Sequence, residues 1–226
     1  MARHLSAQAA AGEDPEQRRR RVSTILRRLR GEYEAVCGLR HEGPMQLLVA
    51  TILSAQCSDE MVNRVTPALF ERYPDAAALA VAEQADIEAM INSLGLFRNK
   101  AKSIKGACQL LVDRHGGQVP DDLDALLALP GVARKTANVV LGNAFGRATG
   151  VVVDTHVQRL SQRLGLTEQT DPVKIERDLM AAIPKNRWIE ASHTIIWHGR
   201  KCCAARRPAC GRCVIADLCP RLGVDD

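Results

Sequence analysis

Apolar residues recur along most of the chain at the three- and four-residue spacing of an amphipathic helix. In the first such stretch, residues 22–29, the opposite face is arginine. From Pro44 onward, glycine and proline separate successive helical stretches. The pattern predicts helices at 46–53, 62–69, 75–81, 87–94, 101–112, 123–129, after Gly131 through Leu141, and at 155–164, 172–182 and 188–198. The one β-like run, 151–153, is too short for a sheet, so the sequence predicts an all-α fold.

One junction between predicted helices has a distinctive sequence, Leu-Pro-Gly-Val-Ala-Arg-Lys-Thr-Ala at 129–137. An apolar helical stretch stops at Pro130-Gly131 and a new one starts at once, which predicts a helix-hairpin-helix. Gly131 lets the backbone pass close to another molecule. The first amides of the second helix can bind an anion. Because the net charge is +5, the expected anion is a nucleic-acid phosphate.

Lys135 is the first candidate for chemistry, because it lies in the first turn of the second hairpin helix. The positive end of a helix dipole disfavours an ammonium there by about 0.3–1 kcal/mol. Together with Arg134 and partial burial, this field favours the neutral, nucleophilic amine. Such an amine can attack C1′ of a nucleotide, expel the base and leave a Schiff base from which the strand breaks by elimination. The alternative is a lysine that only contacts phosphate.

Asp154 is the second candidate, nineteen residues after Lys135 and directly before an apolar helix. As an N-cap it would contribute about 1 kcal/mol to helix stability. A fixed carboxylate is also what an oxocarbenium-like sugar requires as base and sugar separate. The two roles are compatible. Both side chains would face one cleft if the intervening helix returns antiparallel.

Five of the eight cysteines lie between Cys202 and Cys219. Four of them follow a C-x6-C-x2-C-x5-C spacing: Cys203, Cys210, Cys213 and Cys219. This spacing indicates a metal site. It does not distinguish zinc from an iron–sulfur cluster, and Cys202 is an alternative first ligand. The remaining three, at positions 37, 57 and 108, are expected to be small buried residues.

Composition limits the partners. Basic residues surround the cysteine cluster, and we expect phosphate contacts from Arg206, Arg207 and Arg212. An aromatic content of 3% argues against stacking platforms for single strands. No apolar run reaches the roughly 18 residues of a membrane helix, and the N-terminus lacks a signal-peptide core. We therefore expect a cytoplasmic or nucleoid-associated protein. Residues 1–17 lack periodicity and are expected to be disordered.

The hairpin segment, the Val-Asp-Thr-His sequence at 153–156 and the cysteine spacing together resemble the endonuclease III family of helix-hairpin-helix DNA glycosylases with AP lyase activity. The resemblance extends from about residue 22 to Cys219. It implies two helical domains flanking a DNA-binding cleft. A six-helix barrel would span 37–147, and 18–36 with 148–226 would form the other domain. There the four spaced cysteines would hold one four-iron–four-sulfur cluster.

The resemblance also implies roles for single residues. By position, Lys135 resembles the family's nucleophile and Asp154 its catalytic aspartate. Gln56 resembles the residue that fills the gap left by a flipped base, and Leu96 the wedge in the opposite strand. Four residues of the hairpin would contact DNA: Gly131, Val132, Ala133 and Arg134. The implied substrate is duplex DNA with oxidised or ring-saturated pyrimidines or abasic sites, bound by a monomer.

One hairpin residue departs from the family pattern, because Ala133 stands where a second glycine is usual. If that position needs a positive φ, its methyl group would cost roughly 1 kcal/mol, and we expect weaker DNA binding at most. Two other functions remain possible. In a module that only grips DNA, Asp154 in its specific context would be unexplained. An adenine-removing relative usually lacks the hairpin lysine and carries an extra C-terminal domain, whereas here Lys135 is present and the chain ends seven residues after Cys219.

Overall fold

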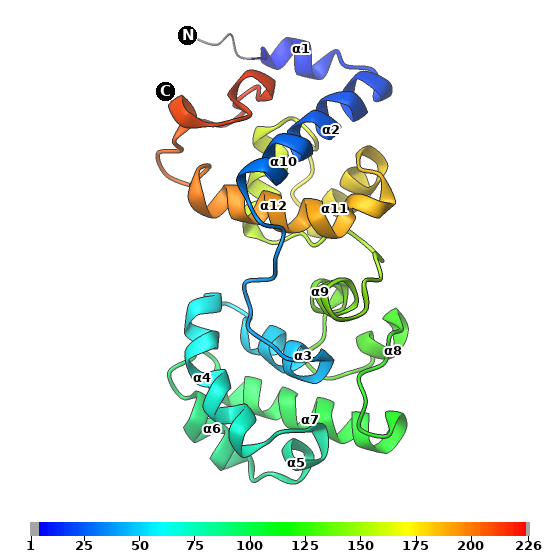
Figure 1. Cartoon of the computed structure of the whole chain (residues 1–226), viewed down its shortest axis with the longest axis vertical. Coiled ribbons are helices and arrows are strands. Elements are labelled where there is room, and N and C mark those ends of the chain that lie inside the picture. The colour runs from blue at the N-terminus through cyan, green and yellow to red at the C-terminus, as the bar shows by residue number, and fades with distance from the viewer. Residues whose placement is uncertain (1–4, 225–226) are drawn as a thin grey trace. The chain divides into compact units, whose positions relative to one another are not determined.

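The computed structural model of the chain describes residues 5–224 and divides into two compact units. One unit is formed by Cys37–Thr149, and the other by the residues up to Val36 with those from Gly150 onward (Figure 1). The all-α prediction is confirmed, since the described residues form helices and no strand. The valine run at 151–153 is extended and buried. Across residues 5–224, no helix is both long and apolar enough to cross a membrane.

The Cys37–Thr149 unit is built around one apolar helix, α3 (Pro44–Leu53). Pro44 occupies its first turn, where a missing amide costs nothing. Every residue from Leu47 to Leu53 is buried, as expected for a helix surrounded by others. The other helices of this unit are α4 (Asp59–Arg72), α5 (Ala76–Val81), α6 (Gln84–Ile91), α7 (Phe97–His115), α8 (Leu123–Leu127) and α9 (Arg134–Phe145).

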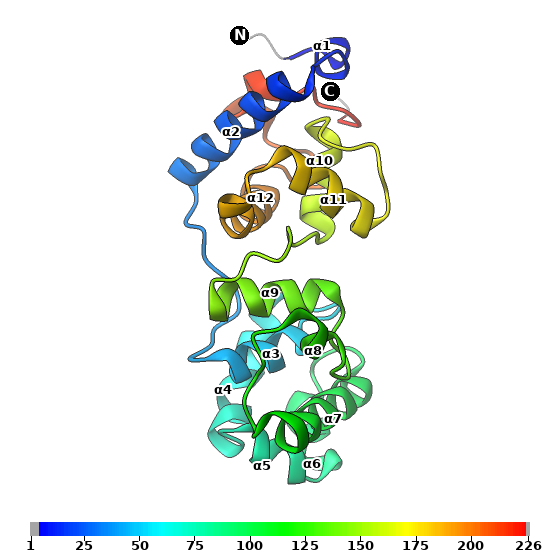
Figure 2. The ribbon, with the colours of Figure 1, turned by 90° about the vertical axis from the view of Figure 1, so that its right-hand side faces the viewer.

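Two long helices pack on α3 and fix the frame of this unit. Figure 2 shows α9 running along α3, with α8 beside it, and α7 packing against α5 and α6. The unit has seven helices, one for each helical stretch that the apolar pattern predicts between residues 46 and 141. The short helices α5 and α6 are separate because Ala82 and Glu83, between them, have extended ψ values of 143° and 130°.

The second unit is a bundle in which α2 (Pro15–Glu32) packs on α11 (Pro172–Ala182) and α12 (Trp188–Lys201). Helix α10 (Thr155–Arg163) packs on α11 and α12. The apolar face of α2 buries Val22, Ile25, Leu26 and Leu29, as its periodicity predicts. After α12, the chain forms two single turns, η2 (Cys210–Arg212) and η3 (Ala216–Leu218).

The N-terminal segment is more ordered than expected. Residues 1–4 lie outside the described range, but α1 (Ala7–Ala11) and α2 both begin before residue 18. Asp14 and Gln17 form a reciprocal capping box at the start of α2, a local signal that periodicity does not register. Glu13 forms an ion pair of 2.6 Å with the buried Arg21. The expectation of disorder over 1–17 is therefore wrong for the described part of that segment.

Candidate catalytic residues and metal centre

The hairpin connects α8 to α9 through a short turn. Asp122 caps α8 by accepting a hydrogen bond of 2.9 Å from the Ala125 amide. The turn closes with the Val132 amide donating to the Leu129 carbonyl over 3.1 Å. Helix α9 then begins at Arg134. The Val132 side chain is buried, and its amide is engaged within this turn.

Gly131 is required at this turn for two reasons. Its φ is +77°, in the left-handed region that glycine tolerates best. A Cβ built on it would lie 2.7 Å from Ser103 Cβ on α7, closer than carbon atoms can approach. The sequence argument expected close approach to another molecule, whereas here the crowding comes from the chain's own helix α7.

Ala133 carries no strain. It is the N-cap of α9 with φ −92° and ψ 171°, extended values that any residue adopts. The expected cost of its methyl group therefore does not arise, and the reason to expect weaker DNA binding is lost. Its side chain makes no capping hydrogen bond, and the first turn of α9 contains no acidic residue. That turn is accordingly suited to an anion from outside the chain.

Lys135 projects from the exposed side of this first turn. The partial burial expected for it is absent, because its side chain is exposed. Arg134 beside it is half-buried. The structure does place Lys135 at the positive end of a 12-residue helix, as the sequence argument expected.

Gln56 and Leu96 share an unusual backbone conformation. Gln56 has φ +55° in the loop between α3 and α4, and Leu96 has φ +59° as the N-cap of α7. Left-handed backbone costs a residue with a side chain roughly 1–2 kcal/mol. Both side chains are exposed, Leu96 by 54%, so the strain does not serve to fill the core.

Asp154 is the N-cap of α10 in the second unit. Its Oδ1 accepts hydrogen bonds from the amides of His156 and Val157 at 2.9 and 2.8 Å. The preceding strand-like residues are fixed by the Val152 amide, which donates to Ser192 Oγ on α12 over 2.9 Å. Within residues 5–224, Oδ2 of Asp154 takes no hydrogen bond. The cap thus fixes the carboxylate and leaves one oxygen available.

Around Asp154, α10 packs tightly on α12. A Cβ on Gly199 would lie 2.9 Å from His156 Cβ. Burial lowers the pKa of His156, and the nearby Asp154 opposes that shift. Arg159 donates to the carbonyls of Gly199 and Cys203 at 3.0 and 2.9 Å. The same helix therefore carries Asp154 at its start and, one turn further on, holds the start of the cysteine loop.

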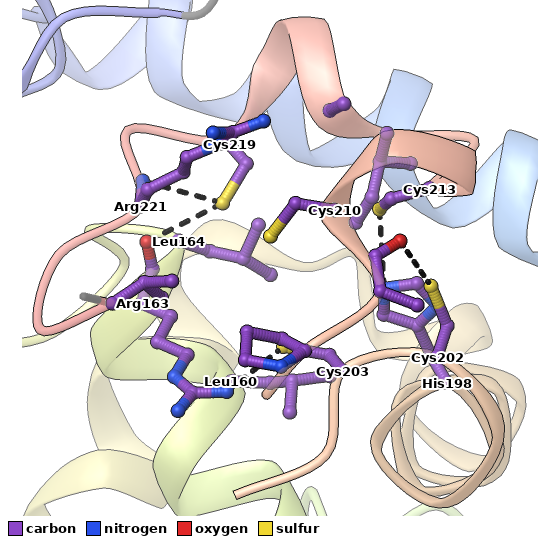
Figure 3. A pocket seen from close by; sticks show the side chains of 15 residues that line it. Leu160, Arg163, Leu164, His198, Cys202, Cys203, Cys210, Cys213, Cys219 and Arg221 are labelled. Atoms are coloured by element: carbon purple, nitrogen blue, oxygen red, sulfur yellow. Dashed lines mark hydrogen bonds between the residues drawn. The ribbon is translucent and has the colours of Figure 1, made fainter. Parts of the chain in front are cut away.

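The four spaced cysteines line one pocket, shown in Figure 3. Donors surround their sulfurs. Arg163 donates to Cys203 Sγ over 3.3 Å and to the Ala204 and Ala205 carbonyls, and the Arg221 amide donates to Cys219 Sγ over 3.4 Å. Burial raises the pKa of the Cys213 thiol to about 12, a cost that a coordinated metal removes by binding the thiolate. Four thiols with cationic and amide donors suit an iron–sulfur cluster.

Sequence reasoning did not identify His198 as part of this pocket. The ligand atoms of His198, Cys202 and Cys213 all lie within 4.8 Å of one another, so Cys202 shares the pocket as expected of an alternative ligand. His198 Nδ1 lies 3.1 Å from the Tyr33 hydroxyl of the neighbouring loop. The signal was present in the chain, because His198 lies in the last turn of α12, four residues before Cys202, which is the C-cap of that helix.

The three arginines expected near the cysteines are all exposed. Arg212 donates to the Lys201 carbonyl over 2.9 Å. Arg207 has a left-handed φ of +52°. Among the described residues, Arg206 and Arg207 have no ion-pair partner, so their charges are available to an anionic ligand.

Comparison with known proteins agrees with these features. Residues 49–185 match the model of the HhH-GPD superfamily of base excision DNA repair proteins, and residues 203–219 match the iron–sulfur binding domain of endonuclease III. Endonuclease III of Synechocystis is 60% identical over 204 residues, which cover 90% of this chain and 93% of that protein. The chain belongs to the endonuclease III family. The Escherichia coli enzyme is 40% identical, over 86% of this chain and 92% of that one.

Solved structures of endonuclease III agree with this family assignment. A non-covalent complex of endonuclease III with DNA aligns with a TM-score of 0.85 at 41% identity, covering 90% of this chain and 95% of that one. A trapped covalent intermediate of endonuclease III with DNA aligns equally well, covering 96% of that chain. As a member of the endonuclease III family, the chain is a base excision repair DNA glycosylase with AP lyase activity. Its iron–sulfur binding segment begins at Cys203 and ends at Cys219.

Proposed function

We propose that this enzyme removes oxidised or ring-saturated pyrimidines from duplex DNA and cleaves the strand through a Schiff base on Lys135. The observation that carries the proposal is the hairpin. It presents an exposed amine at the positive end of α9, beside a turn with no acidic residue, on a helix packed against α3. A rigid helix holds a reacting group more accurately than a loop does.

The proposed reaction uses the side chains of Lys135 and Asp154. Lys135 Nζ forms a bond to C1′ while the base leaves with the electrons of the glycosidic bond and takes up a proton. The fixed carboxylate of Asp154 stabilises the positive charge that develops on the sugar. Nζ then loses a proton, the C1′–O4′ bond breaks as O4′ takes up a proton, and the nitrogen lone pair forms the C1′=N bond of the Schiff base. A proton then leaves C2′, the 3′-phosphate departs, and water releases the lysine.

DNA contacts in the proposed complex come from both units. The amides in the first turn of α9 and the Arg134 side chain bind phosphate at the hairpin. Gln56 fills the space that the extruded base leaves, and Leu96 inserts into the opposite strand. Extruding a base requires inserted side chains of this kind to hold the duplex open. Three exposed arginines of the cysteine segment bind further phosphates: Arg206, Arg207 and Arg212.

The proposed cofactor is one four-iron–four-sulfur cluster held by Cys203, Cys210, Cys213 and Cys219. The family match that starts at Cys203 favours it over Cys202 as first ligand. When bound, the cluster supplies folding energy to a segment with little core of its own. Arg163 and Arg159 tie the same segment to α10. Purified protein should be brown with near four irons per chain, and a colourless zinc-loaded protein would contradict the proposal.

We further propose a monomer that works in the bacterial cytoplasm, where its DNA substrate is. The test of function uses a panel of duplexes, each with one modified base or an abasic site, with and without borohydride. Borohydride should trap wild-type protein on ring-saturated pyrimidines. Lys135→Ala should lose the trapped adduct, whereas Lys102→Ala, which removes another exposed lysine of the same unit, should keep it. A normal adduct with Lys135→Ala would refute the assigned nucleophile.

A further inference from the structure

Lys100 and Cys57 form a buried contact that the reaction does not use. Lys100 lies near the start of α7 and is only 4% exposed. Its Nζ donates to Cys57 Sγ over 3.0 Å. Within residues 5–224, that sulfur is the hydrogen-bond partner of the ammonium. A buried ammonium requires a negative partner to offset its lost hydration, and Cys57 Sγ is the group that the structure places beside it.

Cys57 is also accessible, unlike an ordinary core cysteine. It is half-buried and lies in the loop between α3 and α4. Reactive cysteines occupy such electropositive, partly exposed surroundings. The N-terminus of α4 follows at Ser58, but Asp59 and Glu60 in its first turn oppose the helix dipole, so Lys100 carries the argument. Cys108 provides the contrast, because it is fully buried and burial raises its pKa to about 12.

We propose that Cys57 is a covalent modification site, a thiolate stabilised by Lys100 that reacts with small electrophiles and with hydrogen peroxide. With peroxide, the sulfur attacks one oxygen, the O–O bond breaks, and the departing hydroxide takes a proton from solvent to become water. The sulfur is oxidised by two electrons to a sulfenic acid, and the peroxide is reduced. A thiol reductant restores the cysteine.

Modification at Cys57 has a consequence that rests on the proposed function. Cys57 follows Gln56, whose left-handed backbone the loop must hold. An added group on the sulfur displaces Lys100 and pushes on that loop, because the ammonium lies within 3.0 Å. Peroxide should therefore reduce cleavage of damaged duplexes, and a thiol reductant should restore it.

The first experiment measures alkylation of the cluster-loaded protein by iodoacetamide at pH 7, with the cysteine peptides quantified by mass spectrometry. A free thiol is about 3% ionised at this pH. Full ionisation, discounted for the lower nucleophilicity of a stabilised thiolate, gives a rate about threefold higher. We expect Cys57 to lose about that factor in Lys100→Met, and to keep its rate in Lys100→Arg. Cys108 is the unreactive internal control.

Two outcomes would overturn the site. One is an equal Cys57 rate in wild type and Lys100→Met. The other needs no variant: a wild-type rate that climbs about tenfold per pH unit up to about pH 8.5, as for a free thiol. The second experiment compares peroxide-treated wild type and Cys57→Ala on a damaged duplex, each relative to its own untreated activity. Equal losses would refute the effect on DNA cleavage, whereas absent trapping in untreated wild type would instead refute the proposed function.

Discussion

Substitution of Gly131 by alanine tests the packing that fixes the hairpin. Gly131 and Gly117 have nearly the same left-handed φ, +77° and +78°. An added Cβ at Gly117 would meet nothing within 4 Å, whereas at Gly131 it would lie 2.7 Å from Ser103 Cβ and 3.0 Å from Ser103 Oγ. The two substitutions therefore share one cost, the backbone strain, and differ in a second, the overlap with α7.

The magnitudes follow from these two costs. Left-handed backbone costs an alanine about 1 kcal/mol relative to glycine. Forcing an extra methyl group into a packed site adds about 1–3 kcal/mol. Gly117→Ala should thus destabilise the protein by about 1 kcal/mol and Gly131→Ala by about 2–4 kcal/mol. For a chain of this size, each kcal/mol lowers the melting temperature by about 2–4 °C.

The assay is thermal unfolding of the cluster-loaded variants at one scan rate, followed by circular dichroism. A second cycle removes the overlap, since Ser103→Gly takes away the atoms that the new methyl group meets. Gly131→Ala should lower the free energy of unfolding less in the Ser103→Gly background than in wild type, and the difference should be about the 1–3 kcal/mol that the overlap costs. Equal losses for Gly131→Ala and Gly117→Ala, with no coupling to Ser103, would refute the view that α7 holds the turn.

Three further predictions concern other positions. Asp154→Ser keeps an N-cap oxygen, so its melting temperature should exceed that of Asp154→Ala by the equivalent of about 1 kcal/mol, while both variants lose base release in a damaged-duplex assay. Arg21→Ala leaves the largely buried Glu13 carboxylate and the Leu164 and Leu218 carbonyls without their donor, and thermal unfolding should show a loss of about 3–5 kcal/mol. The Arg21→Met, Glu13→Leu double variant should recover the part that is due to the unpaired carboxylate. Leu96→Gly relieves about 1 kcal/mol of backbone strain and loses a similar free energy from the buried part of the leucine side chain. The melting temperature should therefore barely change while duplex cleavage falls.

The helices could be predicted from sequence because their signals are local. Apolar periodicity located the core face of α2 and the buried helix α3, and Pro130-Gly131 located the hairpin. The wrong expectations, for Gly131 and Ala133, concern positions whose conformation depends on other parts of the chain. The need for glycine at position 131 depends on Ser103, which is distant from it in the sequence and meets it only in the folded unit. The conformation of Ala133 depends on how α9 begins, and no composition rule reports its φ of −92°.

The cysteine segment illustrates the same limit at the candidate site. Spacing alone found the four cysteines, since metal-ligand spacing is a property of the chain. It could not find Arg163, which reaches Cys203 across 40 residues, or the contact of Lys100 with Cys57 across 43. Such partners come from helices that meet only in the folded unit. Lone arginine and lysine residues within a helix carry no pattern that marks them as buried donors.

Backbone strain connects the fold to the proposed DNA contacts. In residues 5–224, four non-glycine residues have left-handed φ: Gln56, Leu96, Arg207 and Arg221. Arg221 has an internal reason, because its amide donates to Cys219 Sγ. The other three are exposed, so packing does not require them to be strained. Each gives up roughly 1–2 kcal/mol that a glycine would save. A strained backbone outside the core is explained if the side chain that it positions acts on a binding partner. These three residues are the ones assigned to the flipped base, the opposite strand and a phosphate.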